Sequence, residues 1–225
     1  MRIYSIFKAI EGEGSEIGIP KTFIRTVGCP VKCKNCDTPE ALDVRQGIEI
    51  PVDQIIQKVE EFGLECITIT GGEPLIQKNL YLLISLLKKK GYYTTLETSG
   101  QLFDKEIFQV TDFLSVDAKT PSTGVECNFK VHEDLLQAPS FNNKLQIKCV
   151  VNDRVDFDFV VYYYNRFKKL LKPNQLIITP CWEVEKELNR DFVKKIVKLV
   201  LENNLPIRVI IQQHKIIYGP RAKNV

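Results

Sequence analysis

Three cysteines close together form the strongest chemical signal in this chain. Cys29, Cys33 and Cys36 follow one another in the spacing C-x3-C-x2-C. A structural zinc site uses four ligands, and a simple iron–sulfur electron carrier uses four thiolates. Three thiolates on a four-iron cubane leave one iron without a protein ligand, and that iron can hold a reacting molecule. The spacing therefore favours reactive chemistry over a structural metal.

A zinc knuckle is the alternative for the same loop, with its fourth ligand supplied from elsewhere. Zinc favours paired C-x2-C motifs, and Cys33 and Cys36 form one such pair. Candidates for the fourth ligand are the two histidines and four isolated cysteines, Cys66, Cys127, Cys149 and Cys181. These cysteines lie mostly in apolar runs, where cysteine usually acts as a small buried side chain.

The composition describes an ordinary globular chain and argues against several classes of partner. The net charge is only +3, which gives no warrant for nucleic-acid binding. Apolar runs such as Leu80–Leu87 are far too short to cross a membrane, and the N-terminal run has no signal-peptide pattern. Seven cysteines, three of them clustered, fit metal or redox use in a reducing compartment. We therefore expect a cytoplasmic protein without a membrane partner.

Short β-rich runs alternate with helical patterns along the chain, without a linker or a repeat. The β-rich runs are 21–27, 66–70, 92–97, 113–117, 145–151, 175–179 and 207–211. Apolar residues recur at helical spacing over 52–62, 80–87, 155–171 and 190–202. This alternation predicts an α/β fold with a parallel sheet. About seven units do not complete an eightfold barrel, so we predict a partial (open) TIM-like βα barrel, formed by a single domain over residues 1–225.

The polar motifs fall just after the predicted strands, where parallel α/β proteins place their active sites. The cysteine loop follows the first predicted strand, and Gly71-Gly-Glu-Pro74 follows the second. Two glycines at a strand end allow the backbone to approach a ligand closely, and Pro74 can begin a helix. Asp117-Ala-Lys119, Thr179-Pro-Cys-Trp182 and His214 follow later strands in the same way.

The C-x3-C-x2-C loop after the first strand, together with Gly-Gly-Glu-Pro after the second, resembles the radical S-adenosylmethionine superfamily. The resemblance implies a [4Fe-4S] cluster on Cys29, Cys33 and Cys36, with S-adenosylmethionine chelated by the open iron. One-electron cleavage of that cofactor yields a 5′-deoxyadenosyl radical, which abstracts a hydrogen atom from the substrate. The chemistry belongs to the cofactors, and the protein supplies placement and exclusion of water. We assign no catalytic side chain beyond the cluster and the cofactor radical.

Further motifs resemble the 7-carboxy-7-deazaguanine synthase family over essentially the whole chain. They are Ile10-Glu-Gly-Glu-Gly14, Arg25, Cys36-Asp-Thr38 and Gln213-His-Lys215. The resemblance implies a carbon–nitrogen lyase that converts 6-carboxy-5,6,7,8-tetrahydropterin to 7-carboxy-7-deazaguanine with loss of ammonia, in deazapurine or queuosine biosynthesis. It also implies a homodimer. A flavodoxin or ferredoxin is a plausible reductant for a low-potential cluster.

The resemblance assigns roles to individual residues. Arg25 would pair with the substrate carboxylate, which suits the planar guanidinium, and Thr38 would ligate Mg2+ through its hydroxyl. The family's usual residue at position 11 is glutamine, whereas Glu11 can accept hydrogen bonds but cannot donate them when ionised. The implied substrate contacts are Ile10, Glu11, Gly12, Glu13, Arg25, Thr70 and His214.

The implied contacts to S-adenosylmethionine come from four loops. They are Asn35, Cys36, Asp37, Gly72, Asp117, Ala118, Lys119, Thr179, Pro180, Cys181 and Trp182. Family members often carry Ser-Pro-Lys where this chain has Asp117-Ala-Lys119, and a Gln-Pro start where it has Thr179-Pro. The charged tail 218–225 also departs from the family pattern and is expected to be a mobile end.

Two other functions fit parts of the same pattern. One is a glycyl-radical-enzyme activating protein of the same superfamily, which would act on a protein partner. Its cysteine loop would usually carry a different sequence around the third cysteine, so Cys36-Asp-Thr38 argues against it. The other is a non-catalytic iron–sulfur or zinc module, which anaerobic reconstitution would reveal.

Overall fold

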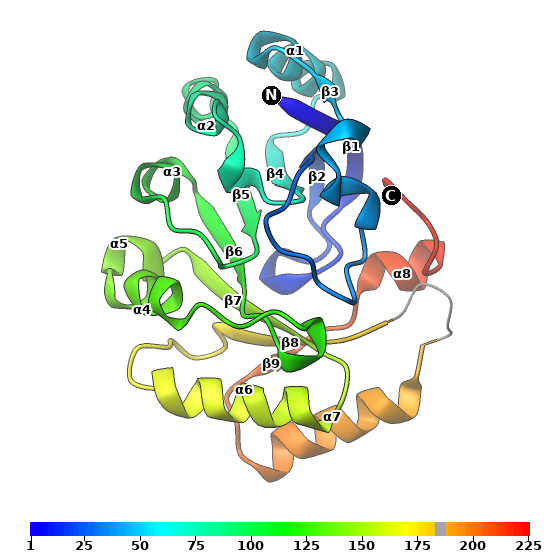
Figure 1. Cartoon of the computed structure of the whole chain (residues 1–225), viewed down its shortest axis with the longest axis vertical. Helices are drawn as coiled ribbons and strands as arrows, with labels where there is room; N and C mark the ends of the chain where they lie inside the picture. Colours follow the sequence, from blue (N-terminus) through cyan, green and yellow to red (C-terminus); the bar gives the residue numbers. More distant parts are fainter. Residues whose placement is uncertain (183–187) are drawn as a thin grey trace.

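The computed structural model describes residues 1–182 and 188–225, and this part of the chain builds one curved sheet with helices around it (Figure 1). The sheet has nine strands in the order β3-β1-β2-β4-β5-β6-β7-β8-β9. The strands are β1 (Arg2–Ile10), β2 (Pro20–Thr26), β3 (Ile48–Glu49), β4 (Cys66–Gly71), β5 (Tyr93–Thr98), β6 (Phe113–Asp117), β7 (Leu145–Val151), β8 (Leu176–Pro180) and β9 (Arg208–Val209).

The helices connect successive strands of the sheet. The α-helices are α1 (Val52–Phe62), α2 (Leu80–Lys89), α3 (Lys105–Val110), α4 (Phe129–Gln137), α5 (Pro139–Asn142), α6 (Arg154–Phe167), α7 (Arg190–Glu202) and α8 (Gln213–Tyr218). The 3-10 turns are η1 (Gly14–Glu16), η2 (Pro39–Leu42), η3 (Val44–Gln46), η4 (Pro74–Ile76) and η5 (Pro121–Thr123).

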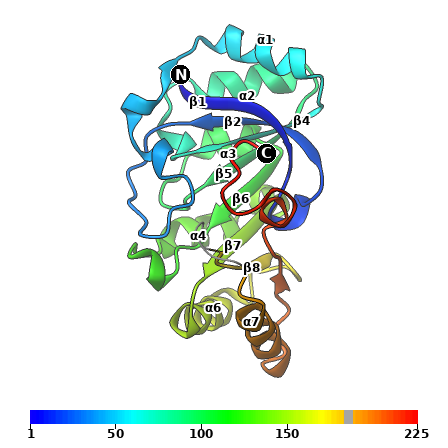
Figure 2. The same cartoon turned by 90° about the vertical axis from the view of Figure 1, so that its right-hand side faces the viewer.

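The sheet is an open barrel, as the sequence predicts. Strands β2 and β4 to β9 run parallel, each beside the next. The short strands β3 and β9 lie at opposite ends of the strand order, so the sheet does not close. Helices α1 to α7 follow one another around one side of the sheet, while α8 and the C-terminus lie on the other (Figures 1 and 2). The enclosed side is therefore left for loops and a ligand.

The N-terminal strand β1 is absent from the sequence prediction and makes the sheet mixed rather than wholly parallel. It pairs antiparallel with β2 and with β3. The Phe7 and Phe23 rings face each other in this pairing, with centroids 5.2 Å apart. The cysteine loop consequently follows the second strand in chain order, which is the first strand of the parallel part.

The longer helices form where apolar residues recur with helical spacing. In α1, Val52, Ile55, Ile56 and Val59 are all buried, and the helix ends at Gly63, whose φ of 69° is a left-handed conformation that glycine adopts readily. In α2 the same spacing buries four residues against the sheet. None of the described helices is long and apolar enough to cross a membrane.

Candidate active site

A cavity of about 530 Å³ lies at the C-terminal ends of the parallel strands, where the sequence places the site. Most of the predicted residues line it. They are Ile10, Glu11, Gly12, Glu13, Arg25, Cys29, Cys33, Asn35, Cys36, Asp37, Thr38, Thr70, Gly72, Asp117, Ala118, Lys119, Cys181, Trp182 and His214. Thr179 and Pro180 are outside this lining set, and both are buried within β8.

The cysteine loop is anchored to the Gly71–Pro74 segment by backbone hydrogen bonds. The Gly72 amide donates to the Thr26 carbonyl at 3.1 Å, and the Glu73 amide donates to the Gly28 carbonyl at 2.8 Å. A Cβ atom on Gly72 would lie 2.2 Å from the Gly28 oxygen. Only a glycine therefore allows the two loops to approach this closely.

Glu73 holds the Gly71–Pro74 segment in place through its carboxylate and is a structural residue here. Its carboxylate is buried and accepts from the Thr98 hydroxyl at 2.8 Å and from the amide of Ser99 at 2.8 Å. It also accepts from the Ser99 hydroxyl and from the Leu75 amide. Several donors on one carboxylate satisfy it without a cation, so Glu73 ties the loop after β4 to the end of β5.

The three cysteines lie half-buried on one wall of the cavity. Burial raises the pKa of the Cys29 thiol, and it raises the pKa of Cys36 to about 11. Thiols in such a place need a positive partner before they ionise, and iron supplies that charge. The residues thus fit a cluster held at one side of a ligand cavity.

The arrangement of thiols bears on the zinc alternative. Within residues 1–182 and 188–225, no three Cys, His, Asp or Glu side chains converge as the ligands of a single ion do. A closed zinc site requires that convergence. A cubane does not, because each thiolate binds a different iron.

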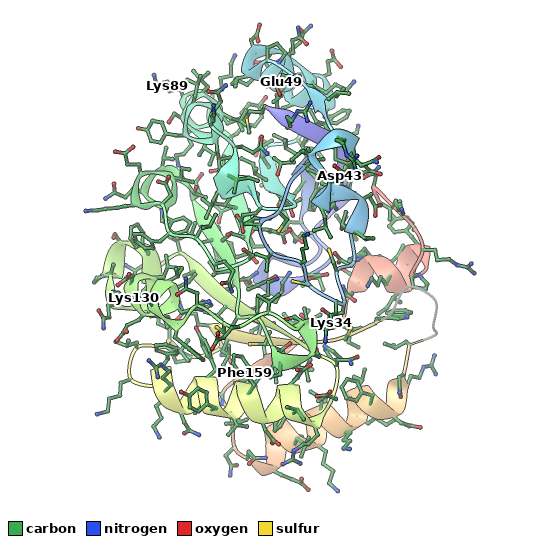
Figure 3. All side chains as sticks on the ribbon, in the orientation of Figure 1. Lys34, Asp43, Glu49, Lys89, Lys130 and Phe159 are labelled. Atoms are coloured by element: carbon green, nitrogen blue, oxygen red, sulfur yellow. The ribbon has the colours of Figure 1, made fainter. Side chains whose placement is uncertain are left out.

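Lys34 at the tip of the cysteine loop meets the turn that follows β6. Its amide donates to the Thr123 carbonyl at 2.9 Å, and its side chain lies over Gly124. Figure 3 labels Lys34 at this inner position, whereas Lys89 and Lys130 project from the outer helices. The loops after β2 and β6 therefore enclose the cluster side of the cavity together.

Asn35 carries an unsatisfied donor at the cluster side of the cavity. Its Nδ2 atom is buried, and no partner for it is present among the described residues. A buried amide donor without an acceptor is uncommon in folded proteins. A polar ligand in the cavity would satisfy it, which fits the predicted contact between Asn35 and S-adenosylmethionine.

Arg25 and Thr38 meet just beyond the third cysteine of the loop. The Arg25 Nη1 atom donates to the Thr38 hydroxyl at 3.1 Å, and that hydroxyl donates to Asp37 Oδ1 at 3.1 Å. The Arg25 guanidinium also lies 5.7 Å from the centroid of the Phe7 ring, a cation–π distance. Arg25 is therefore held in place with its charge at the cavity wall, where it can meet an anionic group.

A network of alternating charges crosses the floor of the cavity. Lys148 Nζ donates to Glu13 Oε2 at 2.7 Å and lies 3.8 Å from Asp117 Oδ1, while Lys119 Nζ contacts Asp117 Oδ2 at 2.7 Å. Gln212 adds a hydrogen bond of 2.6 Å to Glu13. Burial opposes ionisation of Glu13, but Lys148, His214 and the hydrogen bonds from Gln212 and Lys148 together outweigh it and lower its pKa to about 2. These groups are fixed as charged residues.

His214 completes the substrate side from α8 and packs over Gly12. A Cβ atom on Gly12 would lie 2.1 Å from His214 Nδ1, and the Gln213 amide donates to the Gly12 carbonyl at 2.9 Å. Burial lowers the pKa of His214 below 6.5, partly offset by Glu13, so the neutral imidazole is favoured. The Glu-Gly-Glu run and the last helix thus meet at the cavity, although they are far apart in sequence.

Several lining residues had no role assigned from the sequence. Lys148, Glu97 and Gln212 all line the cavity. A signal for Lys148 existed, because Gln146 and Lys148 alternate with apolar residues along β7 and must share one face of the strand. Glu97 shares its position near the end of β5 with the predicted motifs on neighbouring strands.

The C-terminal tail is packed against the site, which corrects the prediction of a mobile end. Lys223 Nζ lies 2.6 Å from Glu40 Oε1, and Ser5 donates to Asn224 Oδ1 at 3.0 Å. Burial raises the pKa of Glu40, but the hydrogen bond and charge of Lys223, a backbone hydrogen bond and the charge of Arg25 together outweigh it, so the net shift is downward. The tail also lines the cavity, next to α8 in Figure 2.

Comparison with known proteins agrees with this geometry. The family model described as "Radical SAM superfamily" matches residues 23–126, which include the cysteine loop and the Gly71–Pro74 segment. The crystal structure of QueE from Escherichia coli superposes with a TM-score of 0.71 at 23% identity, covering 95% of this chain and 94% of that chain, which shows likeness of fold. The fold and the cysteine loop thus define a radical S-adenosylmethionine enzyme, whose family implies a [4Fe-4S] cluster and S-adenosylmethionine.

Curated relatives narrow the class to one family. The 7-carboxy-7-deazaguanine synthase of Koribacter versatilis is 31% identical over 100% of both chains. That of Thermoplasma acidophilum is 29% identical over 97% of this chain and 98% of the relative. The chain belongs to the 7-carboxy-7-deazaguanine synthase family, and it is a lyase of that kind.

Proposed function

We propose that the enzyme converts 6-carboxy-5,6,7,8-tetrahydropterin to 7-carboxy-7-deazaguanine and releases ammonia. The observation that carries the proposal is the meeting of the cysteine loop with Arg25 and Thr38 around one cavity of about 530 Å³. Cavities of roughly 300–1,000 Å³ suit small ligands, which favours a small heterocycle over the protein partner of an activating enzyme. The bound cluster and S-adenosylmethionine would together supply a radical that abstracts hydrogen from this substrate.

The residues of the chain divide between two sides of the cavity. Cys29, Cys33 and Cys36 would hold the cluster. The backbone at Gly72 and the unsatisfied Asn35 amide would contact S-adenosylmethionine. The other proposed contacts to this cofactor are Asp37, Asp117, Ala118, Lys119, Cys181 and Trp182, all of which line the cavity.

The substrate would lie against the Arg25 side of the cavity. Arg25 would pair with the substrate carboxylate, and Glu13 would accept from the N–H donors of the pterin edge. His214 from α8 and Thr70 from β4 would also contact the ring. Enclosure by α8 and the tail would exclude water from the reacting centre.

Mg2+ would bind at Thr38 together with the substrate. In the free protein the Thr38 hydroxyl accepts from the Arg25 guanidinium, so a divalent cation there would face a positive charge at short range. A substrate carboxylate would neutralise Arg25 and add oxygen ligands, which Mg2+ requires. We therefore expect the ion to bind weakly to the free enzyme and tightly once the carboxylated substrate is present.

The proposal extends to the assembly and the setting of the enzyme. We infer a homodimer in the cytoplasm, reduced by a flavodoxin or a ferredoxin, and a place in deazapurine or queuosine biosynthesis. These follow from membership of the family and from the absence of a spanning helix among the described residues.

The decisive experiment is anaerobic incubation of the reconstituted enzyme with 6-carboxytetrahydropterin, S-adenosylmethionine, Mg2+ and reductant. The expected product is 7-carboxy-7-deazaguanine, identified by mass, together with one equivalent of ammonia. Cys29→Ala should lose the cluster absorbance and all turnover, whereas Cys66→Ala, at the start of β4, should keep both. Cofactor cleavage without any change in the pterin would overturn the substrate assignment.

A further inference from the structure

A lysine buried beneath the cavity has a role that the site description leaves unexplained. The Lys21 side chain, on β2, is 0% exposed. Its ammonium contacts Glu16 Oε2 at 2.5 Å, Thr95 Oγ1 at 3.0 Å and Glu11 Oε2 at 3.3 Å. The ammonium therefore donates hydrogen bonds to Glu16 and Thr95 and forms an ion pair with Glu11, so three acceptor atoms surround it.

Glu11 lies between this lysine and the cavity. Its Oε2 atom accepts from the Thr68 hydroxyl at 3.2 Å and lies against Lys21. Within residues 1–182 and 188–225, we find no hydrogen bond to Oε1. Glu11 lines the cavity, whereas Lys21 does not. One carboxylate oxygen is thus committed to the protein, and the other is available to a ligand.

We propose that Lys21 is a positioning residue for the substrate and that it acts through Glu11. The ammonium holds Oε2 from below, and Oε1 then faces the cavity as an ionised acceptor for N–H donors on the heterocycle. This inference rests on the proposed function, because the ligand that it describes is the pterin.

The charges around Glu11 explain why it needs a cation beneath it. Lys21 on β2 and Lys148 on β7 face it as positive groups, while Glu97 on β5 and the nearby Glu13 face it as negative groups. Burial and Glu97 raise the pKa of Glu11 to about 7, against the opposing effect of the two lysines. Without Lys21 the neutral acid would be favoured still further, and a neutral acid is a weaker acceptor.

Replacing Glu16 should affect the ionisation of Glu11 in the direction opposite to replacing Lys21. It is the other carboxylate on the Lys21 ammonium, and it does not line the cavity. Removing its charge leaves Lys21 to interact with Glu11 alone, which favours the ionised form of Glu11. Glu16→Gln and Lys21→Met should therefore move the pH dependence of ligand binding in opposite directions.

The test measures equilibrium binding of 6-carboxytetrahydropterin to the reconstituted enzyme with S-adenosylmethionine and Mg2+ but without reductant. The Kd should rise as the pH falls below the pKa of Glu11, by up to about tenfold per pH unit, since the neutral acid is the weaker acceptor. The pH at which this rise begins is the break. Lys21→Met should move this break to higher pH and raise the Kd about tenfold or more at pH 7. Glu16→Gln should move it to lower pH, and Glu11→Gln should abolish it.

A double-mutant cycle separates positioning from general stability. In the Glu11→Gln background, Lys21→Met should change the Kd less than about twofold, because coupled residues give non-additive effects. Lys88→Met is the matched control, because it removes an ion pair with Asp112 outside the cavity. It should leave both the Kd and the break unchanged.

Two outcomes would overturn the inference without touching the proposed function. In the first, the wild type binds and converts the pterin, and the Lys21→Met variant shows its pH break at the same pH as the wild type. The other is a full effect of Lys21→Met in the Glu11→Gln background. Should Lys21→Met fail to fold, Glu16→Gln provides the test. A pH break in Glu16→Gln at the same pH as in the wild type would also overturn the inference. A wild-type enzyme that does not bind the pterin would instead refute the proposed function.

Discussion

Arg25 offers a direct measurement of how the substrate carboxylate is recognised. Arg25→Ala should raise the KM for the pterin by roughly 10- to 100-fold, because a charged hydrogen bond contributes about 1.5–3 kcal/mol. The binding of S-adenosylmethionine should change little, since Arg25 is assigned to the substrate carboxylate and not to the cofactor. Steady-state kinetics and separate cofactor titrations test both statements. Arg25→Lys keeps the charge without the planar fork and should recover only part of the loss.

Thr38 is a separate test of the magnesium site. Thr38→Ala should keep the cluster and raise the Mg2+ concentration needed for half-maximal activity by about tenfold. This factor assumes that the lost ligand contributes about 1.4 kcal/mol to Mg2+ binding. Thr38→Ser, which retains the hydroxyl, should behave nearly as the wild type. An unchanged magnesium response in Thr38→Ala would show that the ion binds elsewhere.

Site residues that belong to a short sequence motif could be predicted. Site residues that are brought to the cavity only by the folding of distant segments could not. The cysteines and Gly72 occur in short patterns whose spacing has a chemical reason, whereas Arg25 was assigned through the family resemblance. Lys148 becomes a neighbour of Glu13 only when β7 and the end of β1 are folded together. No local pattern encodes a contact between residues 135 positions apart.

Gly72 joins two elements, and its replacement should damage the loop that holds the cluster. A Cβ atom there would lie 2.2 Å from the Gly28 oxygen, which is backbone and cannot move aside cheaply. Gly72→Ala should destabilise the protein by about 1–3 kcal/mol and lower the iron content per chain. Thermal unfolding and iron analysis measure the two effects.

Gly63 provides the control for that substitution. Unlike Gly72 it has a positive φ, 69°, and a Cβ atom there meets nothing within 4 Å. Gly63→Ala should cost about 1–2 kcal/mol from the left-handed conformation alone and leave the iron content unchanged. Equal iron loss in both variants would mean that instability alone, not the contact between loops, empties the site.

His132 links α4 to α6 through a hydrogen bond of 2.7 Å to the Tyr163 hydroxyl, and both side chains are fully buried. Burial lowers the pKa of His132 from 6.5 to about 4. Between these values the unfolded chain binds a proton that the native state does not, so stability is lost as the pH falls. The slope should approach about 1.4 kcal/mol per pH unit.

Urea unfolding between pH 5 and pH 7.5 would measure this contribution. His132→Gln should unfold at lower urea throughout and should flatten the slope relative to the wild type. His214 titrates in the same direction and is present in both proteins, so the difference isolates His132. Parallel slopes in the two proteins would contradict the assignment.

The elements that the sequence analysis missed share a physical cause. Strand β1 is only partly buried along most of its length, so it lacks the strict alternation that identifies a strand. Helix α4 buries His132 beside Val131 and Leu135, which interrupts the apolar pattern. Helix α3 has six residues, too few for its spacing to be distinctive. The longer helices and the inner strands, with continuous apolar faces, were predicted correctly.

At the scale of the whole molecule, we predict that residues 1–225 unfold as a single domain. The buried core is one cluster that extends from Met1 to Ile207 and includes residues of β1, β2 and β4 to β8. The fluorescence of Trp182, the one tryptophan of the sequence, and far-UV circular dichroism should therefore give coincident transitions in denaturant. Separated midpoints would indicate two units.

The antiparallel strand at the front of the barrel has a consequence for how the enzyme folds. Glu13, just beyond β1, contacts Lys148 and Gln212, which are 135 and 199 residues away in sequence. Contacts of such high order form late, because a long loop must close before they contribute. The cysteines emerge from the ribosome well before either partner of Glu13. We therefore expect the cluster loop to be complete, and accessible to iron delivery, before the substrate half of the cavity forms.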